Sequence, residues 1–191
     1  MKPDSAFQRL LNTKVKRRVR IEECEVPINS AIDRNLIDAA FFRDSYRTPL
    51  TRDDIGVVEI FFGVFAHHTV WIKWLLITRN HIATWCGLDA PTRSEIMNLE
   101  MKSSYAVGDK IGPWPLFSLT QNELVAGRDN KHLDFRLSVM KEKNPGATTV
   151  VISTVCTTHN DFGRVYLFFI IPFHRWGVRH LMSRAVSAGR L

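Results

Sequence analysis

The sequence predicts an α+β fold in which an antiparallel sheet holds a long C-terminal helix. From residue 105 onward, apolar and polar residues alternate in short runs separated by turn residues, which is typical of strands. Residues 165–171 are apolar on every side, and residues 178–185 continue as an amphipathic helix. A helix that is apolar all round has to be buried, so we expect the sheet to enclose it and an internal pocket to lie between them.

Length and composition are those of a single globular domain. The 191 residues are enough to bury a full core, and the net charge is +7. Much of the positive charge lies at the two ends, which favours anionic partners such as phospholipid surfaces, although a solvated basic face is the commoner explanation. Residues 1–20 are expected to be a poorly ordered basic arm, and residues 21–191 the single domain.

Cysteine usage and the N-terminus predict a cytoplasmic protein. The three cysteines are far apart and form no C-x-x-C pattern, so neither a zinc site nor a disulfide framework is expected. No apolar segment precedes Lys14, so the N-terminus does not resemble a secretory signal peptide. The nucleotide-binding, serine-hydrolase and zinc-protease patterns are also missing, and we expect no cofactor and no metal.

The first half of the domain predicts mainly helices. We expect a short strand over residues 24–28, then a helix capped by Asn29 or Ser30 and running to Phe41. A long helix is predicted over about residues 53–86, with a break or kink because it would be about 48 Å long at 1.5 Å per residue. Its residues 60–77 could just reach across a bilayer, but Lys73 alone would cost about 3 kcal/mol there. A soluble helix, buried or on a membrane surface, is therefore expected.

The second half predicts four strands followed by the C-terminal helix. The strands are expected over residues 114–120, 123–128, 132–139 and 148–159, with a strong turn at residues 144–146. Pro172 leaves two possibilities open. Either residues 161–188 form one helix with a kink, or residues 164–171 are one more strand and the helix starts after Pro172.

Several separated blocks resemble a known bacterial family. They are VGD at residues 107–109, IGPW at 111–114, GRDNKHLDFR at 127–136, and GR-x-Y at 163–166 with PFH at 172–174. In this order they are similar to domain-of-unknown-function family 2867, from about Ser45 to the C-terminus. The family also occurs, in divergent form, behind short-chain-dehydrogenase-like domains.

The resemblance implies a helix-grip fold, like that of START-type and polyketide-cyclase (SRPBCC) proteins. In this fold a curved antiparallel sheet grips a long C-terminal helix, which favours the helical interpretation of residues 161–188. Proteins of this kind bind lipids, hormones or polyketides, and a minority act on them as enzymes. We therefore expect a small hydrophobic or amphipathic ligand between sheet and helix. The expected ligand-binding residues are Trp114, Phe135, Tyr166, Phe169 and Arg128.

A polar cluster on the third of these strands is the candidate for catalysis. His132 would be the general acid or base, Asp134 would orient it, and Arg136 would hold an anionic group, as in an enzyme of polyketide-cyclase type. Residues two apart on a strand are too distant for direct hydrogen bonds, so a solvent-facing surface with cross-strand charge pairs is the commoner explanation. His159 could join the cluster if its strand pairs with this one, although a capping or turn role is the commoner explanation.

The basic ends and the apolar helix bear on two further classes of partner. A membrane-surface protein would use residues 61–85 as an interfacial helix and its basic ends for anionic lipid. Nucleic-acid binding is not expected, because no recognised module accompanies the positive charge. The adjacent His67 and His68 cannot bind one metal from a helix, because their side chains point about 100° apart. The sequence does not predict the oligomeric state.

Overall fold

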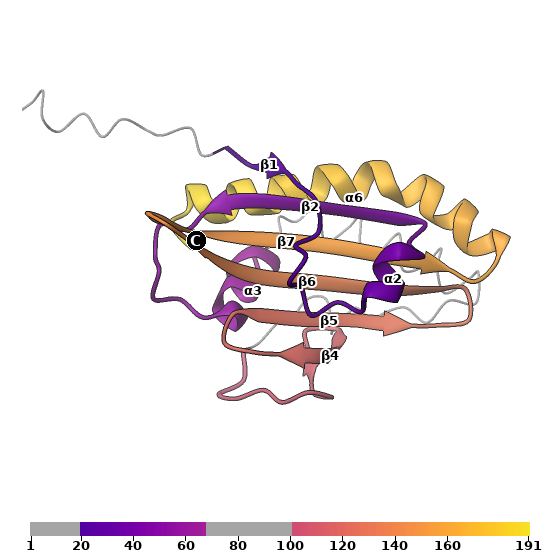
Figure 1. Cartoon of the computed structure of the whole chain (residues 1–191), viewed down its shortest axis with the longest axis horizontal. Coiled ribbons are helices and arrows are strands. Elements are labelled where there is room, and N and C mark those ends of the chain that lie inside the picture. The colour runs from indigo at the N-terminus through magenta and orange to yellow at the C-terminus, as the bar shows by residue number, and fades with distance from the viewer. Residues whose placement is uncertain (1–19, 68–100) are drawn as a thin grey trace, which may run out of the picture.

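The computed structural model describes residues 20–67 and 101–191, which form an α+β fold. In this part of the chain seven strands form one open, curved antiparallel sheet in the order β1-β2-β7-β6-β5-β4-β3 (Figure 1). The strands are β1 (Glu22–Glu23), β2 (Phe42–Pro49), β3 (Lys110–Ile111), β4 (Trp114–Leu119), β5 (Glu123–Asp129), β6 (Leu133–Asn144) and β7 (Ala147–Thr158). The helices are α2 (Arg34–Asp38), α3 (Val57–Phe65) and α6 (Asp161–Ser187).

The predicted meander from β4 to β7 is confirmed. β6 and β7 pair along their whole length, from Leu133 opposite Thr158 to Asn144 opposite Ala147. Pro145 and Gly146 form the turn between them, and Gly146 has a φ of 93°. Proline presets the first of these two positions and glycine accepts the positive φ of the second, which is the type II pattern.

One face of the sheet carries the main core, with α3 and α6 against it. Leu137 and Val139 of β6 lie in the same buried cluster as Phe61 of α3 and Met182 of α6. Because successive side chains of a strand point to opposite faces, Phe135 also belongs to this face, which we call the inner face. In Figure 1 α6 runs behind and beside β2 on this side of the sheet.

The opposite, outer face is covered by residues 24–40. Val26, Ile32 and Ile37 pack there against Val125 and Val155. The buried carboxylate of Glu123 also holds this segment to the sheet. Glu123 accepts hydrogen bonds of 2.6 Å from Ser30 Oγ, Ala31 N and Ser138 Oγ. Figure 1 shows α2 in front of the sheet and α6 behind it.

The C-terminal segment is one helix from Asp161 to Ser187 with Pro172 inside it, so the strand alternative for residues 164–171 is wrong. Asn160 caps it by accepting a 3.0 Å hydrogen bond from Gly163 N. The expectation that its first half is buried on all sides is also wrong. Phe168 and Phe169 are exposed. The helix lies along the β2–β7 side of the sheet, so only one of its faces meets the core.

The predicted long helix over residues 53–86 is corrected. α3 begins at Val57 and ends at Phe65, with Ala66 as its C-cap, and residues 68–86 lie outside the described residues. Phe61 and Phe65 are buried in the core, so this part of the predicted interfacial helix does not lie on the surface. None of the helices in residues 20–67 and 101–191 is long and apolar enough to span a membrane.

The segment before α3 also differs from expectation. β1 is Glu22–Glu23 instead of residues 24–28, and α2 is a short helix capped by Asp33 instead of one that runs to Phe41. β2 was not predicted, although it lies between β1 and β7. Its inward positions include Asp44, which interrupts the apolar alternation that would have revealed a strand.

Candidate functional site

An arginine lies on the inner face of the sheet among apolar side chains. Arg128 of β5 is opposite Phe135 of β6, just as Ala126 is opposite Leu137 two residues earlier. Ala126 and Leu137 are buried in the main core. Because side chains alternate along a strand, Arg128 and Phe135 extend from this same face. The sheet therefore places a cation at the margin of its own core.

Aromatic side chains from β4, β6 and α3 contact one another at the start of β4, where this arginine is held. The ring centroid of Trp114 is 5.7 Å from that of Phe135 and 6.1 Å from that of Phe61, and both pairs have edge-to-face geometry. Arg128 Nη2 donates a 2.9 Å hydrogen bond to Pro113 O, which holds the guanidinium beside the start of β4. Trp114 and Phe135 are only partly buried. We call Trp114, Phe135 and Arg128, with Tyr166, the inner wall.

Tyr166 joins the inner wall from α6, whereas Phe169 does not. Tyr166 and Phe135 both pack against the small buried cluster that contains Leu133 and Leu167. Phe169 is 64% exposed and does not pack against this cluster. Thus four of the five residues predicted to bind ligand lie on the inner side of the molecule.

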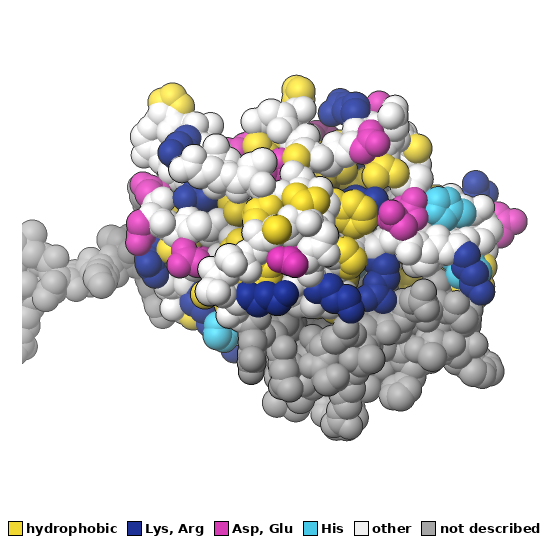
Figure 2. All heavy atoms as spheres, turned by 90° about the horizontal axis from the view of Figure 1, so that it is seen from below, with side chains coloured by type: hydrophobic (Ala, Val, Ile, Leu, Met, Phe, Trp, Pro, Cys, Tyr) yellow, Lys and Arg dark blue, Asp and Glu magenta, His cyan; other side chains and the backbone are white. Residues whose placement is uncertain are grey.

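The inner wall combines the two features that an amphipathic ligand with an anionic end requires. Its aromatic side chains offer apolar contact area, and a guanidinium can bind a carboxylate, sulfonate or phosphate in bidentate fashion. Seen from the β4 edge of the sheet, hydrophobic side chains gather in the middle of the described surface, and lysine and arginine side chains lie beside them (Figure 2).

The three residues proposed for catalysis have different partners. His132 Nδ1 is 3.2 Å from Asn160 Oδ1, and the His132 ring lies against Phe162 with centroids 4.7 Å apart. Asp134 pairs with His159 instead, at 3.0 Å between Oδ1 and Nε2. Because β6 and β7 pair, His159 does contact the cluster, through Asp134.

Arg136 is engaged on the outer face. It forms a two-pronged ion pair with Asp129, and its guanidinium lies 3.6 Å from the centroid of the Phe117 ring. Asp134 and Arg136 alternate with Phe135 and Leu137, so they are on the side of the sheet opposite α6. This arrangement is a set of cross-strand charge pairs, and it does not direct Asp134 toward His132.

A buried polar cluster between β2 and α6 was missed by the sequence reasoning. The Asp44 side chain is almost fully buried, and it accepts a 3.0 Å hydrogen bond from Tyr46 Oη and lies 3.3 Å from His174 Nε2. Burial, and then the charge of Asp44, raise the pKa of Tyr46 to about 12. The sequence offered one signal for this cluster. Phe42, Asp44 and Tyr46 occupy alternate positions, and Asp44 is a charged residue between two aromatic ones. The contact attaches α6 to β2.

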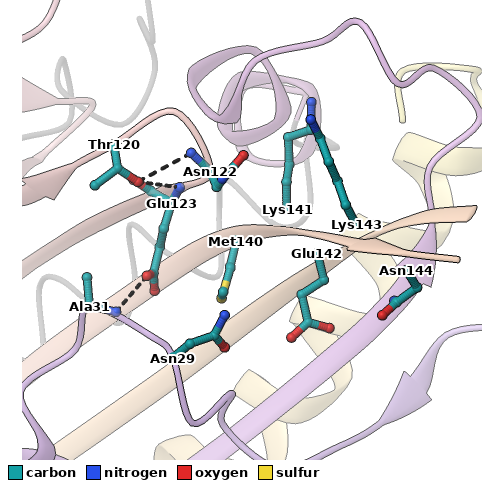
Figure 3. A pocket seen from close by; sticks show the side chains of 10 residues that line it. All are labelled: Asn29, Ala31, Thr120, Asn122, Glu123, Met140, Lys141, Glu142, Lys143 and Asn144. Carbon is teal, nitrogen blue, oxygen red and sulfur yellow. Dashed lines mark hydrogen bonds between the residues drawn. The ribbon is translucent and has the colours of Figure 1, made fainter.

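Two hollows of the described surface are polar and lie away from the inner wall. The larger one, of about 450 Å³, is at the ends of β5 and β6 (Figure 3). There the Glu123 side chain points toward Ala31, while Lys141 Nζ donates to the carbonyl oxygens of Asp53 and Ile55. A second hollow of about 290 Å³ lies along β1 and β2. Neither is the predicted cavity between sheet and helix.

Within residues 20–67 and 101–191, no three His, Cys, Asp or Glu side chains are grouped so that they could hold a metal ion.

Comparison with known proteins identifies the chain at the level of its family. No match is found among curated proteins or among solved structures. The family model described as "Protein of unknown function (DUF2867)" matches residues 36–181. Since this match covers most of the sequence, the chain belongs to the DUF2867 family.

Proposed function

We propose that the protein binds a small amphipathic molecule, with an apolar body and an anionic end, at the inner wall. The observation that carries this proposal is the cross-strand pair of Arg128 and Phe135 on the face of the sheet that also holds the core. A charged side chain at such a position is costly unless it has polar partners. Among the described contacts Arg128 donates to Pro113 O, and a guanidinium also forms charge-assisted hydrogen bonds with anionic groups.

The wider arrangement supports a relationship to the helix-grip fold. A long C-terminal helix lies against one face of a curved antiparallel sheet, and the aromatic side chains are on that face. We place the ligand along the inner face of the sheet beside α6, with Trp114 and Phe135 along its apolar body and Arg128 at its anionic end. Tyr166 would contact it from the helix. The partners of Asp134 and Arg136 do not favour extending this proposal to a reaction.

Isothermal titration calorimetry with matched probes tests the proposal. Dodecanoate and dodecanol have the same apolar chain, but only dodecanoate carries a charge. We expect dodecanoate to bind more tightly, and we expect Arg128→Gln to weaken its binding by about 10- to 100-fold, because a hydrogen-bonded ion contact is lost. Dodecanol binding should be unchanged in the same variant.

Arg52→Gln is the control, because Arg52 is an exposed arginine that pairs only with the neighbouring Asp54 among the described contacts. It should bind both probes as the unmodified protein does. The proposal is refuted if neither probe binds, or if Arg128→Gln and Arg52→Gln have the same effect on dodecanoate.

A further inference from the structure

A second apolar stripe runs along α6 on the side opposite its core-facing residues, and at its N-terminal end the Phe162 ring lies against His132. Its members are separated by three or four residues, so they share one face of the helix. They are Phe162, Val165, Phe169, Phe173 and Trp176, and we call them the outer stripe. Their exposed fractions lie between 37% for Phe162 and 64% for Phe169. The core-facing residues, among them Leu167 and Val178, lie on the opposite face of the same helix. A helix that is apolar on both faces has more apolar surface than the fold uses.

Positive charge borders the outer stripe. α6 contains four arginines and one aspartate, which gives the helix a net charge of +3. Arg164, Arg175 and Arg179 lie on the flank of α6 between the stripe and the core face. The Arg175 and Arg179 guanidinium groups are 5.6 Å and 4.8 Å from the ring centroids of Phe42 and Tyr46 on β2. The side chains of Arg164 and Arg179 remain 60% and 49% exposed although each has an acidic partner, Asp161 and Glu23 respectively. Exposed ion pairs of this kind are weak, so the guanidinium groups can exchange these carboxylates for phosphates.

We propose that the outer stripe is the surface with which the protein docks on an anionic lipid membrane, with α6 lying in the plane of the interface. Aromatic side chains on one face of a helix and arginines beside them are the features of an interfacial amphipathic helix. The acidic lipids attract the arginines, and the phenylalanines and Trp176 insert between the lipid headgroups. This inference concerns the far side of α6 and does not depend on the ligand proposed for the inner wall.

A second copy of the chain fits the outer stripe less well. From Phe162 to Trp176 the stripe is about 21 Å long and offers five side chains. A stable interface uses about 20–30 residues from each partner. Pairing two such helices would also bring two rows of arginines together, and their repulsion opposes association. Charge complementarity therefore favours an anionic surface.

Co-sedimentation with vesicles tests the proposal directly. Vesicles of phosphatidylcholine alone are compared with vesicles of phosphatidylcholine and phosphatidylserine in a three-to-one ratio. We expect binding to the mixed vesicles at low ionic strength, weaker binding at high ionic strength because salt screens the attraction, and little binding to pure phosphatidylcholine. The double variant Phe169→Ser and Phe173→Ser should bind about tenfold more weakly or worse, because its inserted apolar area is reduced.

Each variant has a matched control elsewhere on the surface. Ile28 is 90% exposed and lies in the segment that covers the outer face of the sheet, so Ile28→Ser removes an exposed apolar side chain without touching α6. Arg175→Gln should weaken binding several-fold, whereas Arg34→Gln, which removes an exposed charge on α2, should not. Circular dichroism verifies that all variants are folded.

Four outcomes would overturn the proposal. The first is an absence of binding to mixed vesicles at low ionic strength, and the second is undiminished binding by the double variant. The third is an equal loss of binding in Ile28→Ser. The fourth is a dimer in analytical ultracentrifugation that the double variant converts to a monomer, since a second copy would then cover the outer stripe.

Discussion

Replacing Gly163 by alanine should weaken the attachment of α6 to the sheet. A Cβ atom at this position would lie 2.4 Å from the carbonyl oxygen of His132, and contacts below 3.0 Å are essentially never seen for real Cβ atoms. The first turn of α6 and the connection between β5 and β6 would therefore have to separate by at least the difference, 3.0 − 2.4 = 0.6 Å. Both partners are backbone, so no flexible side chain can absorb the shift.

Two opposing effects determine the magnitude. Forcing extra volume into a packed contact costs about 1–3 kcal/mol. Alanine in place of glycine within a helix contributes about 0.5–1 kcal/mol in the other direction, because the unfolded chain loses freedom. We expect the clash to dominate and Gly163→Ala to lower the free energy of unfolding by about 1–2 kcal/mol.

Gly177 in the same helix is the matched control. Nothing lies within 4 Å of a Cβ built there, so Gly177→Ala should raise the free energy of unfolding by about 0.5–1 kcal/mol. Urea unfolding followed by far-UV circular dichroism measures both variants. The reasoning is refuted if Gly163→Ala unfolds at the same urea concentration as the unmodified protein or at a higher one.

Two further predictions concern buried polar groups. Glu123→Ala should lower the free energy of unfolding by about 2–4 kcal/mol, because three donors lose a charged acceptor. Glu142→Ala, on the neighbouring strand, is the control and should change this free energy little. Equal free energies of unfolding for the two variants in urea would contradict the prediction. The pKa of Tyr46 rises from 10.0 to about 12 in the folded protein, mainly through burial. The neutral phenol of Tyr46 therefore stabilises the folded protein fully below about pH 10. This contribution, at most about 3 kcal/mol, is lost as the pH rises through about 12. Tyr46→Phe should remove this alkaline loss in urea unfolding across the pH range, and an unchanged pH dependence would contradict the assignment.

The sheet was predictable where local chemistry decides the conformation. From β4 to β7, side chains alternate between the faces, and the turn at Pro145 and Gly146 needs only the conformational preferences of its own residues. β2 escaped prediction because Asp44 occupies an inward position. Only the arrival of His174 from α6, together with Tyr46, makes a carboxylate tolerable there.

The candidate site was also predictable only in part. The alternation along β5 and β6 already places Arg128 and Phe135 on a common side of their strands, and Trp114 lies on an element that was predicted as a strand. The partners of the charged residues were not predictable. Asp134 pairs with His159 and Arg136 with Asp129, and these choices depend on which strands are neighbours.

The sequence by itself determined the α+β class, the meander of strands, the apolar character of the C-terminal segment and the family. These depend on periodicity, on turn residues and on blocks of neighbouring residues, which are all local properties. The tertiary structure alone decided that α6 continues through Pro172, that α3 ends at Phe65 and that the outer stripe lies opposite the core-facing side of α6. A helix that is apolar all round has no preferred side until a sheet packs against one of its faces, so burial and exposure along α6 are set by its neighbours.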